Sequence, residues 1–167
     1  CEGLKDIVLK ESSDSVVYRV KNLSGEEIDS KVLLKLYKIR EEGKDSLLVL
    51  DRTEKANVKL DMDWAKNLQS GRYRIVLQSF DSNNREVQYS NNITLFSKSD
   101  SRPPIDSNFW IYDDCAEGSL LSFGTSKKDA DIYYSILAKD KIIEDKVYSV
   151  SDSIINMDCS YKKEYGD

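Results

Sequence analysis

The side chains of this chain that could carry out chemistry are mainly carboxylates. Three pairs of aspartates lie close together in the sequence: Asp61 with Asp63, Asp113 with Asp114, and Asp129 with Asp131. A glycosidase holds two carboxyl groups roughly 5 to 10 Å apart and raises the pKa of one of them. All three pairs fall at the ends of expected strands or in turns, where Asp is favoured because it hydrogen-bonds to the nearby backbone. We interpret them as turn residues, and a hydrolase with a carboxylate pair is the less favoured alternative.

Other common catalytic groups are missing from the sequence. It contains no histidine, which excludes Ser-His-Asp triads, histidine acid-base catalysis and zinc sites that use histidine. None of its glycines belongs to a phosphate-binding loop. Residues 81–86 alternate some oxygen donors as a calcium loop does, but they lack its central glycine, so a hairpin turn is the better interpretation. We expect no catalytic residue, no cofactor and no metal.

The three cysteines cannot all pair within the chain. Cys115 and Cys159 are candidates for a disulfide, although buried free thiols are at least as good an interpretation, because unpaired Cys is among the most buried residue types. Cys1 also has two interpretations. It is either the boundary of an excised piece, which we favour, or the acylated first residue of a bacterial lipoprotein, which would give the protein a lipid anchor.

The composition is that of an ordinary globular protein. A chain of 167 residues with 40% hydrophobic content can hold one sizeable domain or two small ones. Its 30 acidic and 25 basic residues give a net charge of -5, which would repel phosphate backbones, so we expect no nucleic-acid partner. No apolar run approaches the roughly 20 residues of a membrane-spanning helix, so we expect no membrane span.

Residues 68–97 predict a β-hairpin. Tyr73, Ile75 and Leu77 share one face of a run with period two, which is typical of a strand with one buried face. Residues 81–84 are turn formers. The return strand carries apolar residues at Val87, Tyr89, Ile93 and Leu95.

This hairpin closes a series of shorter strands. We expect them at residues 4–10, 16–20, 31–39, 47–50 and 56–60, with one helical turn at 63–68 that Asp63 caps. Seven strands at intervals of roughly 8 to 14 residues are typical of an immunoglobulin-like β-sandwich. Residues 1–98 are therefore the first expected domain.

Both prolines lie in residues 99–106, which predicts a stiff linker. Strand patterns then recur at residues 109–112, 119–124, 131–137, 141–144, 147–150 and 153–161. We expect a second sandwich over residues 107–167, incomplete because so small a domain buries little of its surface. The predicted fold is all-β, with two tandem immunoglobulin-like antiparallel sandwiches.

Four aromatic residues of the second domain form a candidate binding surface: Trp110, Tyr112, Tyr133 and Tyr134. Tyr and Trp dominate binding hot spots and stack on sugar rings. Packing in the core is the favoured interpretation, since sandwiches need aromatic cores and Tyr prefers strands.

Three stretches occur in an order that resembles a known family. Residues 20–28 contain a polar N-x-x-G turn and lead into the strand at 32–39, residues 68–75 contain a Ser-Gly-x-Tyr turn, and residues 123–136 look like the start of the next such domain. Together they resemble the macroglobulin-type domains of bacterial alpha-2-macroglobulin-like proteins, especially the large exported ones of Bacteroides-type bacteria.

The resemblance implies an array of sandwiches in an exported protein, in the periplasm or at the cell surface, that traps or resists proteases. Reactive members of the family carry a Cys-x-Glu-Gln thioester. The nearest stretch here is Cys115-Ala116-Glu117-Gly118, and Gly118 has no side-chain amide, so no thioester can form.

We therefore expect non-catalytic structural and interaction domains of such a protein, with proteins, including proteases, as partners of the longer chain. The alternative is an immunoglobulin-like binding module of a surface lipoprotein. Such a module would recognise a glycan or a host protein through the aromatic residues around Trp110.

Overall fold

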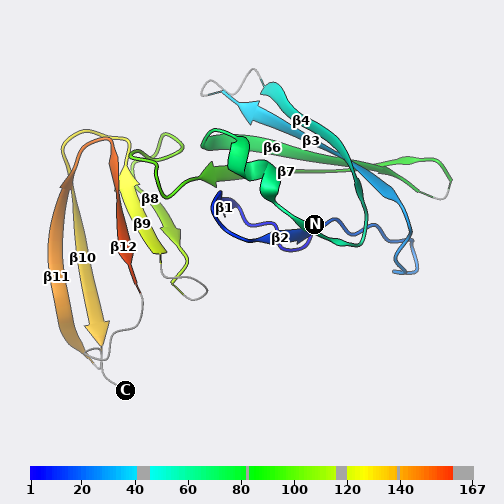
Figure 1. Cartoon of the computed structure of the whole chain (residues 1–167). Coiled ribbons are helices and arrows are strands. Elements are labelled where there is room, and N and C mark those ends of the chain that lie inside the picture. Colours follow the sequence, from blue (N-terminus) through cyan, green and yellow to red (C-terminus); the bar gives the residue numbers. More distant parts are fainter. Residues whose placement is uncertain (41–45, 82, 116–119, 139, 160–167) are drawn as a thin grey trace. The chain divides into compact units, whose positions relative to one another are not determined.

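The computed structural model describes residues 1–40, 46–81, 83–115, 120–138 and 140–159, and these consist mainly of β-strands (Figure 1). The described residues form twelve strands and one short 3-10 helix. The chain divides into two compact units, residues 1–98 and residues 99–167. The expected all-β class is confirmed.

The first unit contains two sheets. The larger has five strands in the order β1-β7-β6-β3-β4, in which β1 runs parallel to β7 and the other neighbours are antiparallel. Its strands are β1 (Ile7–Leu9), β3 (Lys31–Ile39), β4 (Ser46–Lys55), β6 (Gly71–Phe80) and β7 (Glu86–Phe96). The smaller sheet is an antiparallel pair of β2 (Ser15–Val17) and β5 (Lys59–Asp61).

The core of the first unit is built from alternate residues of these strands. Tyr73, Ile75 and Leu77 of β6 are buried as their spacing predicted, and so are alternate residues of β3. Val87 and Tyr89, two of the four apolar residues noted on the return strand, are exposed, whereas Ile93 and Leu95 are buried. Since β2 and β5 have only three residues each, they are too short to cover the full length of β6 and β7.

The expected helical turn is a 3-10 helix over Asp63–Asn67, with Trp64 buried and Leu68 packed against the core. The capping role given to Asp63 is wrong. Met62 occupies the N-cap position without a side-chain hydrogen bond, and the Asp63 carboxylate accepts a hydrogen bond of 2.6 Å from Lys66 Nζ.

Two expected strand boundaries are also wrong. Residues 51–55 belong to β4, although their charges suggested a loop. In the second unit, residues 141–150 form one strand rather than two. Among the described strands, β4 and β11 each have a neighbour on one side only, so their charged side chains can reach water while the backbone hydrogen bonds of the strand are kept.

The second unit also contains two sheets. Three antiparallel strands have the order β12-β9-β8, and the remaining two form an antiparallel hairpin. The strands are β8 (Trp110–Asp113), β9 (Leu120–Thr125), β10 (Ala130–Ala138), β11 (Lys141–Val150) and β12 (Ser153–Asp158).

Residues 99–106, which we expected to form a separate linker, are bonded to the second unit. The Ser101 carbonyl accepts a hydrogen bond of 3.2 Å from Ile154 N–H, and the Ile105 carbonyl accepts one of 3.1 Å from the Ser126 hydroxyl. Arg102 Nε lies 3.1 Å from a carboxylate oxygen of Asp152. The proline-containing segment is therefore held to the rest of the second unit by hydrogen bonds and an ion pair.

The two units repeat one pattern of four strands. The antiparallel pair β2–β5 of the first unit corresponds to β9–β12 of the second, and the hairpin β3–β4 corresponds to β10–β11. Both hairpins carry one register shift, after Leu36 in β3 and after Ile136 in β10. A β-bulge near the loop end of both hairpins supports the correspondence, because bulges are specific features of a strand pair.

Candidate functional site

The aspartate pairs lie near strand ends, in a turn and, for Asp63, at the start of the 3-10 helix. Asp61 is the last residue of β5, and Asp129 has the left-handed φ of a turn residue, at 54°. One carboxylate of each pair accepts a hydrogen bond from a nearby group: Asp63 from Lys66 Nζ (2.6 Å), Asp113 from Cys115 N–H (3.0 Å) and Asp131 from the Ser149 hydroxyl (2.7 Å). These bonds hold turns and strand neighbours in place, as expected of turn residues.

The calcium-like stretch is a hairpin turn closed by Asp81. One carboxylate oxygen accepts hydrogen bonds of 2.8 Å from the N–H groups of Asn83 and Arg85, and the other accepts one of 2.9 Å from Arg85 Nε. The backbone hydrogen bond from Arg85 is the main cause that lowers the pKa of Asp81. Among the described residues, no group of three or more acidic or cysteine side chains is placed to hold a metal ion.

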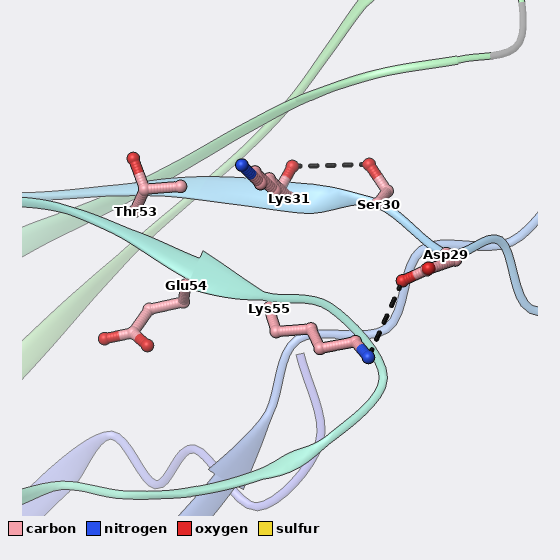
Figure 2. Close-up of a pocket in the computed structure, with 6 residues that line it drawn as sticks. All are labelled: Asp29, Ser30, Lys31, Thr53, Glu54 and Lys55. Atoms are coloured by element: carbon pink, nitrogen blue, oxygen red, sulfur yellow. Dashed lines mark hydrogen bonds and ion pairs between the residues drawn. The ribbon is translucent and has the colours of Figure 1, made fainter.

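A charged hollow lies beside one end of the β3–β4 hairpin (Figure 2). Lys31 and Lys55 are cross-strand partners there, and Lys55 Nζ is 3.9 Å from a carboxylate oxygen of Asp29. The Ser30 hydroxyl donates to the Lys31 carbonyl at 3.3 Å. Both members of the Asp29–Lys55 pair are highly exposed, and such surface pairs contribute little stability or electrostatic focusing. We find no arrangement here that favours a specific ligand.

Cys115 and Cys159 form a disulfide with an S–S distance of 2.04 Å and a Cα–Cα distance of 5.6 Å. The disulfide links Cys159, which directly follows β12, to Cys115, which follows β8. Cys1 is a free and exposed thiol. The stretch compared with a thioester continues into residues 116–118, which lie outside the described residues.

The four aromatic residues of the candidate binding surface do not lie on one surface. Trp110 and Tyr112 are buried, with 3% and 6% of their surface exposed. Tyr134 is half-buried, and Tyr133 points to the other face of β10 with 78% exposed. Of these four side chains, only Tyr133 is exposed enough to contact a partner. It differs from Tyr134 because neighbouring residues of a strand point to opposite faces.

Three aromatic rings pack together in the second unit, the buried ring of Phe123 and the half-buried rings of Tyr134 and Tyr148. Phe123 of β9 stacks on Tyr134 of β10 with ring centroids 6.1 Å apart, and Tyr148 of β11 meets Phe123 edge-on at 5.7 Å. The Tyr148 hydroxyl also lies 3.8 Å from the sulfur of Met157. This cluster joins the three-stranded sheet to the hairpin, so its aromatic residues serve packing.

An exposed apolar surface covers the outer face of the β10–β11 hairpin. It consists of two cross-strand pairs, Tyr133 with Val147 and Leu137 with Ile142, and all four side chains are exposed. We call these four residues the hairpin outer face. Contiguous exposed apolar side chains often mark a contact surface, but here the polar pair Ser135 and Asp145 separates the two apolar pairs.

Three members of the hairpin outer face were not recognised from the sequence. Residues 141–144 and 147–150 were expected as two strands, whereas both belong to the single strand β11, in which the register shift leaves Ile143 unpaired. The signal that could have identified the face is Tyr133 and Leu137, both placed opposite the inward residues Ile132, Tyr134 and Ile136.

Comparisons with known proteins add no family. A scan of protein-family models gives no match, and none is found among curated protein sequences. The resemblance to alpha-2-macroglobulin-like proteins therefore rests on the three short stretches alone. Within the described ranges, no helix is both long enough and apolar enough to cross a membrane.

Proposed function

We propose that the chain provides two non-catalytic, immunoglobulin-like β-sandwich units that serve as structural and protein-contact domains of an exported bacterial alpha-2-macroglobulin-like protein. The observation that carries this proposal is the strand order of the first unit. The order β7-β6-β3-β4 corresponds to the G-F-C-C′ sheet of an immunoglobulin-like sandwich, and the pair β2–β5 corresponds to strands B and E.

A specific hydrogen bond supports the same interpretation. The Tyr73 hydroxyl donates to the Gln69 carbonyl at 2.7 Å, at the start of β6. A tyrosine that bonds back to the backbone a few residues upstream, at the beginning of strand F, is a hallmark of immunoglobulin-like sandwiches. The recurrence of strands B, C, C′ and E as β9, β10, β11 and β12 favours a tandem array of such units.

Export is supported by the disulfide of the second unit. Cys115 and Cys159 are bonded, and disulfides persist mainly in oxidising compartments such as the periplasm and the cell surface. A cross-link also suits a small domain, whose core alone supplies little stability.

Cell fractionation with thiol labelling tests the proposal. We expect the protein in the periplasmic or surface fraction, with Cys115 and Cys159 protected from alkylation until a reductant is added. We also expect the longer protein to contain further sandwich units on either side of this segment. A cytoplasmic protein with both thiols free, or a hydrolytic activity of the isolated chain, would contradict the proposal.

A second candidate function is a binding module for a glycan or a host protein, favoured by the exposed ring of Tyr133. Tyrosine supplies a large contact surface with few rotatable bonds. A glycan array probed with the full chain distinguishes the two candidates. A glycan-binding module should show a specific signal that is lost in Tyr133→Ala, whereas a scaffold should bind no glycan.

A further inference from the structure

The first and last strands of the first unit lie side by side and run in the same direction (Figure 1). In this pair Ile7 of β1 lies opposite Thr94 of β7, and Leu9 lies opposite Phe96. The other neighbouring strands of the described part of the chain are all antiparallel. The parallel pair therefore joins the strand by which the chain enters the first unit to the strand by which it leaves.

Backbone hydrogen bonds between the two strands extend past both ends of β1. Before β1, the Asp6 carbonyl accepts a hydrogen bond of 2.8 Å from Thr94 N–H. After β1, Lys10 N–H donates one of 2.8 Å to the Phe96 carbonyl. Since the hydrogen bonds of a parallel pair are evenly spaced along the strands, the ladder runs from Asp6 to Lys10.

The Glu11 side chain continues this connection beyond the backbone ladder. Its carboxylate accepts a hydrogen bond from the Ser97 hydroxyl and another, of 3.2 Å, from Lys98 N–H. Glu11 lies in the turn that follows β1, and Ser97 and Lys98 directly follow β7. These bonds therefore tie the segments that continue the two paired strands.

The paired residues are shielded from water. Val8 and Leu9 of β1 are buried, and so are their partners Leu95 and Phe96 of β7. A buried backbone group that loses its partner cannot bond to water at once, so its loss costs more than that of an exposed bond. The strands must therefore slide apart before water can replace their hydrogen bonds.

The direction of the strands decides how these bonds respond to tension. In a parallel pair, the start of β1 and the end of β7 lie at opposite ends of the ladder. Tension applied at Cys1 and beyond Lys98 therefore pulls the two strands in opposite directions along their axes. All the bonds of the ladder are strained together, which is shear.

The neighbouring antiparallel pair responds differently to the same tension. Leu95 at the end of β7 lies opposite Gly71 at the start of β6. Tension on β7 reaches this end of the ladder first, so the bonds between β6 and β7 open one at a time from there. The β1–β7 pair is thus the stronger obstacle to extension of the chain.

The chain reaches its place beside β7 by crossing from one sheet to the other. Glu2 forms an antiparallel bridge with Val17 of β2, in the smaller sheet, through two hydrogen bonds of 2.9 Å. Gly3 follows with a φ of 81°, and a Cβ atom there would lie 2.7 Å from the Ser15 carbonyl oxygen. A glycine is needed at this close approach, after which the chain continues into β1 of the larger sheet.

We propose that the β1–β7 pair is a shear clamp, by which the first unit resists tension transmitted along the chain. This inference rests on the proposed tandem array, because tension in an array passes from unit to unit through the first and last strands of each. The clamp itself belongs to this chain, so it is tested on the chain alone, without the longer protein or its location.

The point of attachment tests the clamp directly. For single-molecule pulling of the full chain, one handle is attached at the C-terminus and the other at the free thiol of Cys1, which shears the β1–β7 pair. The comparison chain carries Ser13→Cys and Cys1→Ser, and its handle is attached at position 13, which is exposed and lies shortly after β1.

Position 13 and Lys98 follow their strands at the same end of the β1–β7 ladder. Pulling from position 13 therefore opens the pair from that end, one bond at a time. At equal pulling speed, the first unit of the comparison chain should unfold at about half the force or less.

The length released identifies which unit has unfolded. Unfolding of residues 1–98 extends the chain by at most about 3.3 to 3.6 Å per residue. Unfolding of the second unit releases less, because the disulfide holds together Cys115 and Cys159, which are 44 positions apart. A reductant should lengthen the second event and leave the first unchanged.

Lys10→Pro removes one bond of the clamp with little backbone strain. Ser12 N–H donates to the Leu9 carbonyl at 3.1 Å, so Lys10 is the second residue of a turn, where proline is favoured. At constant force between Cys1 and the C-terminus, the first unit should unfold about two- to tenfold faster, since the Phe96 carbonyl loses its donor. Lys10→Ala keeps the N–H and is the matched control, with an unchanged rate.

Tyr73→Phe separates resistance to tension from ordinary stability. It removes the hydroxyl bond to the Gln69 carbonyl, so it should lower the free energy of unfolding in urea as Lys10→Pro does. Its bond lies outside the β1–β7 pair and persists when the clamp yields. Its unfolding rate under tension should therefore stay within about twofold of the unchanged chain, because forced unfolding is governed by the barrier.

Equal unfolding forces from the two points of attachment would overturn the proposal. So would equal rates under tension for Lys10→Pro and Lys10→Ala, or an effect of Tyr73→Phe as large as that of Lys10→Pro. A cytoplasmic location of the protein would contradict the proposed function and leave these forces unchanged, so the two failures are distinguishable.

Discussion

The hydroxyl of Tyr73 donates a hydrogen bond of 2.7 Å to the carbonyl oxygen of Gln69, four residues earlier in the chain. The Tyr73 side chain is buried, so this bond connects the core of the first unit to the segment that joins the 3-10 helix to β6. It fixes where β6 starts, and hence the register of its alternating core residues.

Tyr73→Phe should destabilise the first unit by about 0.5 to 1.5 kcal/mol, because the fold loses the hydrogen bond to the Gln69 carbonyl while the ring is kept. Urea unfolding measures the change. Tyr89→Phe is the matched control, since Tyr89 is largely exposed on the neighbouring strand, and we expect a change within about 0.5 kcal/mol. Equal effects of the two substitutions would show that the bond does not stabilise the fold.

Alkaline pH should destabilise the first unit through Tyr18. Burial raises the pKa of Tyr18 to about 12, whereas a tyrosine in an unfolded chain ionises near pH 10. The unfolded state therefore loses its proton first. The free energy of unfolding should be unaffected below about pH 10 and should fall by about 2 to 3 kcal/mol as the pH rises toward about 12.

Tyr18→Phe isolates this contribution. Burial also raises the pKa of Tyr73, so both proteins should lose stability at high pH, but the variant should lose less. Urea unfolding at a series of pH values between about 8 and 12 measures the difference. Parallel curves for the two proteins would exclude Tyr18 as a cause of the alkaline loss.

The parts of the fold that could be predicted are those with strong local alternation. Residues 31–39 and 71–80 show a clear period of two, and both form the expected strands with the expected buried faces. The turn at Asp81 was also predictable, because its hydrogen bonds reach only four residues along the chain.

Features that depend on distant contacts could not be predicted. Asn57 has a φ of 60°, and its side chain bonds the backbone of Val20 and Ile28, which lie 37 and 29 residues away. No local sequence pattern predicts hydrogen bonds between residues so far apart in the chain. The Asn57 bonds also fix the turn between β4 and β5, which helps explain why the boundary of β4 was misplaced.

The candidate site shows the same limit. Alternation correctly places Tyr133 and Tyr134 on opposite faces of one strand, but it does not say which face meets another sheet. Trp110 and Tyr112 are buried on β8, which pairs with β9 in the three-stranded sheet. That packing is decided by the order of strands in space, which the sequence pattern leaves open.

Removal of the disulfide should destabilise the second unit selectively. Cys115 and Cys159 are 44 residues apart, and closure of a loop of this length is worth about 4 kcal/mol through the entropy of the unfolded chain. A Cys115→Ser, Cys159→Ser double variant should therefore exchange its second-unit amides much faster, with the first unit unchanged. Cys1→Ser is the control, because Cys1 is free. Unchanged exchange in the second unit would contradict this prediction.

Gly124 leaves no room for a side chain at the centre of the three-stranded sheet. A Cβ atom there would lie 2.2 Å from the Ser153 carbonyl oxygen and 2.8 Å from Ile154 Cα, and backbone atoms of a paired strand cannot move aside without a change in the sheet. Gly124→Ala should cost about 3 kcal/mol, at the upper end of overpacking effects. Urea unfolding followed by segment-resolved hydrogen exchange measures the loss in β9 and β12.

Gly25→Ala separates steric overlap from backbone strain. Gly25 has a φ of +84° but no heavy atom within 4 Å of an added Cβ, so its substitution should cost only about 1 kcal/mol, from the left-handed backbone conformation. If steric overlap is the larger effect, Gly124→Ala will lower the free energy of unfolding of the second unit clearly more than Gly25→Ala lowers that of the first unit. A cost at Gly124 no larger than at Gly25 would mean that β9 and β12 can separate to admit a methyl group, and that their pairing is looser than the register indicates.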